Sequence, residues 1–141
     1  MLKRALIYGT AAAAGGAAWT LTEYALGFHT EKAEIGRYSG FVAIVFPIAG
    51  IVLALRDARR KERGLTFGRG VAEGAGVTAV MTILAVLFFA IYFKAINPGF
   101  LSAEGTSLGE QLGALCAASL VMGLLISVIA AAVLRRSPQQ M

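Results

Sequence analysis

Residues 53–74 read LALRDARRKERGLTFGRGVAEG, where an apolar run stops at a dense basic cluster and a glycine-rich turn leads into another apolar run. Five of the chain's 13 Lys and Arg residues lie within residues 56–63, together with two acids. Basic loop residues stay on the cytoplasmic side when a membrane protein inserts. The stretch therefore predicts two membrane-spanning helices joined by a short cytoplasmic loop.

Composition extends this interpretation to the whole chain of 141 residues. Hydrophobic residues make up 57% and charged residues 15%, against about 45–50% and 25% in an ordinary globular domain. Charged side chains are absent from four runs, namely residues 5–22, 38–55, 74–93 and 111–134. A bilayer core of about 30 Å needs roughly 20 helical residues, and a soluble bundle would need a charged face on every helix.

We therefore expect an all-α polytopic membrane protein, a four-transmembrane-helix bundle that forms one domain over residues 1–141. The start, MLKRALIYGTAAAAGG, also resembles a signal peptide. The apolar run continues to Trp19 and Leu21, so we expect an uncleaved first span. The expected spans cover residues 5–26, 38–56, 71–93 and 112–134.

The basic residues predict the orientation. Ten of the 13 fall before the first span, between the second and third, or after the fourth. We therefore expect a protein of the bacterial inner membrane with both termini on the cytoplasmic side. The net charge of +5 follows from topology and from contact with anionic lipid headgroups, so no nucleic-acid partner is expected. The residues assigned to this contact are Arg56, Arg59, Arg60, Lys61, Arg63 and Arg69.

Local signals delimit the second and third helices. Asp57 precedes Lys61 by four residues, a favourable helical pair, and the second helix should reach about Glu62. Gly64 should end that helix, and Thr66 should cap the third. Farther along, Asn97-Pro98-Gly99 should end the third helix, and a short external helix is expected to start near Ser107.

Small residues recur at four-residue steps and mark the helix faces that pack closely in lipid. Such stripes predict either a tight bundle extended by a dimer interface, or a polar-lined path between helices. Pro47 falls in the middle of the second expected span, where it would allow a kink. The residues assigned to helix packing are Gly9, Gly16, Gly74, Thr78, Ser119, Gly123 and Ser127.

Acids within spans are functional candidates, because a charge is costly in the membrane. Glu23 shares a helix face with Thr20 and should point into the bundle, either as an interfacial acid paired with Lys32 or Arg37 or as a cation or proton site. Glu73 should form a local ion pair with Arg69, four residues earlier. We treat Glu23, Thr20 and Glu73 as a possible intramembrane polar site.

Signs of catalysis are missing from the sequence. His29 and Cys116 are the only residues of their types, so no zinc site or nucleophile–histidine–acid set can be assembled. GLTFGRG lacks the Lys-Ser/Thr of a phosphate-binding loop. We expect no catalytic residue, no metal, no cofactor and no enzymatic activity.

Short motifs carry a resemblance to a known family. An Arg-Asp pair after the second span, a basic linker, and Thr-Phe-Gly-Arg before the third span are found in the sequence, as are Lys3, an Asn-Pro-x-Phe end to the third span and a closing Arg-Arg pair. These features resemble the bacterial domain of unknown function 4199 family. The resemblance implies a small four-span inner-membrane protein with no established activity. The motif residues are Arg56-Asp57, Thr66 to Arg69, Gly74, Asn97 to Phe100 and Arg135-Arg136.

Two functions remain open from the sequence. The first is a non-enzymatic protein acting through helix packing, as a homo-oligomer, such as a dimer, or as an accessory subunit of a membrane complex. The second is a small dimeric transporter or channel for an ion or small solute, suggested by Pro47 and the inward-facing Glu23. A cavity that touches both residues would favour the second function.

Overall fold

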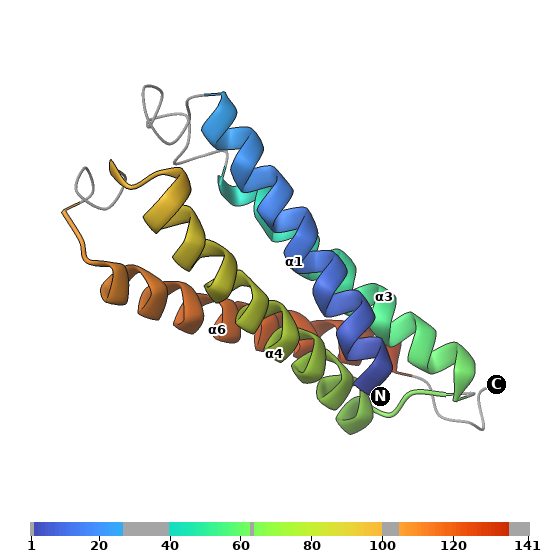
Figure 1. Cartoon of the computed structure of the whole chain (residues 1–141). Coiled ribbons are helices and arrows are strands. Elements are labelled where there is room, and N and C mark those ends of the chain that lie inside the picture. Colours follow the sequence, from blue (N-terminus) through green and yellow to red (C-terminus); the bar gives the residue numbers. More distant parts are fainter. Residues whose placement is uncertain (1, 27–39, 63, 100–104, 136–141) are drawn as a thin grey trace.

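The computed structural model describes residues 2–26, 40–62, 64–99 and 105–135. These residues form four long helices that run alternately up and down (Figure 1). α1 begins and α6 ends at the same end of the bundle, which we call the basic end because α1 starts there with Lys3 and Arg4. The elements are α1 (Leu2–Ala25), η1 (Gly40–Ile44), α3 (Val45–Lys61), α4 (Phe67–Ile91), η2 (Tyr92–Ile96) and α6 (Leu108–Leu134).

Three of the helical segments are long and apolar enough to cross a membrane, namely Phe41–Lys61, Phe67–Ile96 and Leu108–Leu134. α1 has 24 residues, enough for about 36 Å of helix, but it is not among the three. Its glycines, threonines and aromatic residues lower its mean hydropathy. α1 is therefore long enough to span a membrane but less apolar than those three segments.

The helix ends follow the local signals. Glu62 is the C-cap of α3. Gly64 follows with a φ of 154°, a value that favours glycine, and the Gly64 N–H donates a hydrogen bond to the Arg59 carbonyl at 3.0 Å. The Thr66 hydroxyl accepts the Arg69 N–H at 3.2 Å and caps α4. Ser107 likewise caps α6 through the Glu110 N–H, so the expected helix start near Ser107 is confirmed. The expectation that this helix is short was wrong, because α6 continues without a break to Leu134.

The expectation for Pro47 was also wrong. The 3₁₀ turn η1 precedes α3, so Pro47 lies in the first turn of α3 and not in mid-helix. The first-turn N–H groups have no partner within the helix, and a proline there therefore costs no hydrogen bond and produces no interior kink.

Stripes of small residues on α4 and α6 pack against one another in antiparallel register. An added Cβ at Gly70 would lie 2.8 Å from the Ala131 Cβ. One step farther along α4, Gly74 meets the Ser127 side chain, and the next step brings Thr78 against Gly123. These contacts let the two backbones approach closely.

α1 packs against both α3 and α4. An added Cβ at Gly9 would lie 2.8 Å from the Val80 Cβ on α4, and one at Gly50 of α3 would lie 3.0 Å from the Ala12 Cβ. Gly16 differs, since nothing among the described residues lies within 4 Å of its Cβ position. The hydrophobic core lies toward the basic end and is built from Ile51, Ala54, Leu55, Ala58, Leu65, Val77, Ala130 and Ala131.

Candidate functional site

A cluster of four charged side chains joins three helices at the basic end. Glu73 of α4 is fully buried, and Arg4 of α1 donates to it from Nη2 at 2.7 Å and from Nε at 3.2 and 3.3 Å. Arg4 Nη2 also donates to Glu62 at 2.8 Å, next to the end of α3. Arg69 completes the cluster with a 2.7 Å bond to Glu62.

The partner expected for Glu73 is present but secondary. Arg69 Nε lies 3.6 Å from Glu73 Oε1, longer than any of the three bonds from Arg4. Those bonds to Glu73 are the main reason that the pKa of the Arg4 guanidinium is raised above its ordinary value. Sequence reasoning missed this pairing because 69 positions separate the two residues. Two features of the sequence pointed toward the pair: Glu73 falls on the small-residue face of its helix, and Arg4 stands at the start of the first helix.

The three residues of the expected polar site do not come together. Thr20 and Glu23 are both buried near the end of α1, with 5% and 3% of their surface exposed. Glu73 contacts Arg4 near the start of the same helix, roughly 28 Å along its axis from Glu23 at 1.5 Å per residue. The Thr20 hydroxyl donates to the Gly16 carbonyl at 2.9 Å. The pairing of Glu23 with Lys32 or Arg37 lies outside the described residues.

The basic residues assigned to headgroups lie mostly in the last turns of α3 and in the first turn of α4. Arg56, Arg60 and Lys61 are exposed and Arg59 is partly exposed. Lys61 lies 3.5 Å from Asp57, which confirms that local pair, and Arg63 is outside the described residues.

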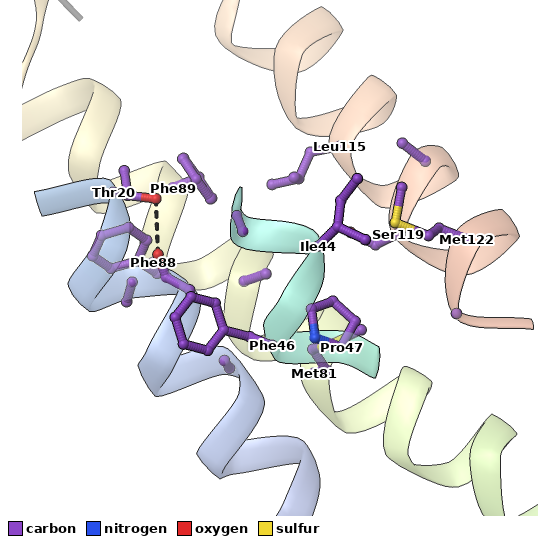
Figure 2. A pocket seen from close by; sticks show the side chains of 17 residues that line it. Thr20, Ile44, Phe46, Pro47, Met81, Phe88, Phe89, Leu115, Ser119 and Met122 are labelled. Carbon is purple, nitrogen blue, oxygen red and sulfur yellow. Dashed lines mark hydrogen bonds between the residues drawn. The ribbon is translucent and has the colours of Figure 1, made fainter. Parts of the chain in front are cut away.

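A cavity of about 250 Å³ lies in the opposite half of the bundle, between α1, the start of α3, α4 and α6. Figure 2 shows Ile44 and Pro47 on one side of it and Leu115 and Met122 of α6 on the other. Phe46, Phe88 and Phe89 add aromatic surface, and Gly16 leaves space on α1. Thr20 and Ser119 are the polar lining residues, whereas Glu23 is not part of the lining.

The cavity begins where the pairing of α4 with α6 stops. One more four-residue step along the two stripes reaches Thr82 on α4 and Ser119 on α6. Ser119 lines the cavity, and the buried Thr82 hydroxyl has no hydrogen-bond partner within the part of the chain that the structure describes. The close packing of α4 against α6 therefore ends at this level.

Aromatic side chains of η2 pack against one another and against the end of α1, next to Phe88 and Phe89 of the cavity lining. Tyr92 is fully buried and Phe93 is 5% exposed, and the ring centroids of Tyr24 and Tyr92 are 6.0 Å apart in an edge-to-face arrangement. The Asn97 amide donates to the Tyr92 hydroxyl at 3.2 Å. These rings therefore pack inside the bundle and do not form an exposed aromatic surface.

Comparison with known proteins identifies the family. The family described as "Protein of unknown function (DUF4199)" matches residues 7–113, and the chain belongs to this family. The match leaves Lys3, Arg135 and nearly all of α6 outside it, so the likeness covers less of the chain than the motifs suggested. No curated protein and no solved structure matches the chain.

Proposed function

We propose that this family member is a four-span integral protein of the bacterial inner membrane that acts by binding other membrane components. The contacts of α1 carry the proposal. α1 packs against α4 at Gly9 and against α3 at Gly50. Because α3 and α4 are apolar enough to span a membrane, we infer that α1 spans it beside them.

Charge supports cytoplasmic termini. The start of α1, the end of α3, the start of α4 and the end of α6 share one end of the bundle (Figure 1). Arg4, Lys61, Arg69 and Arg135 belong to these segments. That end fits the cytoplasmic face, where basic side chains are retained and anionic headgroups lie.

A binding role is favoured over catalysis by how the buried polar groups are used. Glu73 is held by Arg4. The hydroxyls of Thr20, Thr78 and Ser127 donate to carbonyls of their own helices. These groups stabilise the bundle and are not poised for chemistry.

An accessory subunit or a homodimer is the form we favour. α6 packs against α4 and α3 and leaves an apolar face outward that includes Val121, Leu125 and Ile129. A second chain could cover this face. A transporter remains the alternative because the cavity reaches Pro47, but Glu23 does not line it.

Topology and mass test the proposal. A reporter fused after Met141 should be found on the cytoplasmic side of the membrane. A cysteine introduced by His29→Cys should react with an impermeant reagent added from outside. Mild-detergent purification should yield a particle heavier than one 14.7 kDa chain with its bound detergent. A periplasmic C-terminus would exclude the four-span topology, and a strictly monomeric particle without co-purifying protein would exclude the subunit role.

A further inference from the structure

We propose that the cavity between α1, α3, α4 and α6 holds one acyl chain of a surrounding phospholipid, which enters sideways between the start of α3 and the first half of α6. This inference rests on the proposed membrane-spanning function. It names the chemistry of one ligand, a single unbranched hydrocarbon chain.

The lining excludes water. Two of its 17 residues, Thr20 and Ser119, carry a polar side chain, and the Thr20 hydroxyl already donates to Gly16. A buried water needs about two to four hydrogen-bond partners, and apolar cavities of about 150 Å³ are known to stay dry and to take up apolar molecules. The cavity here is larger, at about 250 Å³.

The size of the cavity fits a segment of hydrocarbon chain. Apolar cavities of about 150 Å³ hold a benzene-sized molecule, and the cavity here measures about 250 Å³. The alanines and the two glycines of the lining, Gly16 and Gly123, leave a wall without large side chains along which an unbranched chain can lie.

The mouth of the cavity continues into apolar surface. On the α3 side, Phe41 and Val45 are 67% and 58% exposed, and on α6 Leu120 is 39% exposed. In a bilayer these side chains face acyl chains, so a chain reaches the cavity without leaving hydrocarbon. Occupancy gains dispersion contacts with lining atoms that would otherwise face a void.

Quenching by brominated lipid tests the proposal in reconstituted full-length protein. Trp19 is the only tryptophan, so Trp19→Phe gives a silent background. Phe88→Trp then reports on the cavity, with Leu115→Trp as a second reporter should the first not fold. Ile83→Trp reports on the lipid-facing surface, because Ile83 is 61% exposed on α4.

In phosphatidylcholine vesicles brominated at mid-chain, the reporter at position 88 should be quenched to an extent comparable with the reporter at position 83. Adding Gly16→Leu should reduce quenching at position 88 severalfold, because an isobutyl group would occupy the cavity. Gly113→Leu is the matched control, since Gly113 is exposed, has nothing within 4 Å and does not line the cavity. It should change nothing.

Other outcomes overturn the proposal. Quenching at position 88 by aqueous acrylamide instead of bromolipid would mean a water-filled path. Quenching by neither would mean a closed cavity or one filled by protein, and an effect of Gly113→Leu equal to that of Gly16→Leu would mean that the cavity is not responsible. If the reporter at position 83 also escapes bromolipid, the membrane-spanning function itself fails, which separates the two failures.

Discussion

The two halves of the bundle are held together differently. From the basic end to the middle of the bundle, Gly70, Gly74 and Gly123 bring α4 and α6 into close contact, and Arg4 ties α1 to Glu73. In the opposite half, α4 and α6 lie on either side of a cavity of about 250 Å³. A groove of about 330 Å³ between α3 and α6 lies nearer the basic end, away from the α4–α6 contact. The difference shows what joins helices in lipid: close backbone packing and polar bonds, because apolar side chains gain little by leaving hydrocarbon.

The largest effect is expected where the basic end loses its ion pair. Arg4→Gln would leave the fully buried Glu73 without its main partner, and breaking such a pair costs about 3 kcal/mol or more. Chemical unfolding of the reconstituted protein would measure this loss. Lys61→Gln is the control, because the Lys61 side chain is 66% exposed and its pair with the partly buried Asp57 should contribute less than about 1 kcal/mol.

A double variant sharpens the assignment. Arg4→Gln with Glu73→Gln should recover most of the lost stability, because no unpaired charge remains buried. If the double variant is as unstable as Arg4→Gln alone, the destabilisation comes from lost packing and not from the ion pair.

The next effect concerns backbone approach. Gly123→Leu would place a side chain against Thr78 and should reduce the free energy of unfolding by about 1–3 kcal/mol through overpacking. Leu124→Ile, one residue along and 44% exposed, should change it by less than about 0.5 kcal/mol. Equal thermal shifts for the two variants would show that the α4–α6 contact is not a tight one.

The smallest effect is expected in the open half. Gly16→Leu enters empty space, so we expect a change in stability within about 0.5 kcal/mol, in contrast to Gly123→Leu. Thermal unfolding of the two variants side by side provides the measurement. A loss at position 16 as large as at position 123 would mean that the cavity is closed in the membrane.

Much of the fold was accessible from the sequence because its signals are local. Runs without charge located the long helices, and Gly64, Thr66 and Asn97 marked helix ends that the structure has. Four-residue spacing picked out Gly74, Thr78, Gly123 and Ser127 as facing positions, but it could not show that the two stripes face each other within one chain.

The remaining features depend on contacts between distant segments. Nothing in the sequence ties Arg4 to Glu73, and the place of Pro47 depends on the 3₁₀ turn before it. The cavity could not be predicted from the hydrophobic pattern of the sequence, because a helix face toward lipid and a helix face toward an apolar cavity carry the same kinds of residue. The burial of Tyr92 and Phe93 was hidden for the same reason.

The separation of α4 from α6 at two levels tests the central claim that these two helices pack closely toward the basic end and part in the opposite half. In lipid nanodiscs, on a Cys116→Ser background, spin labels at Phe67 and Val133 report on the basic end, and labels at Leu87 and Ala114 report on the opposite half; all four residues are exposed. Double electron–electron resonance should give a short, narrow distance distribution for the first pair and a longer distance for the second. Equal distances at both levels would contradict the account.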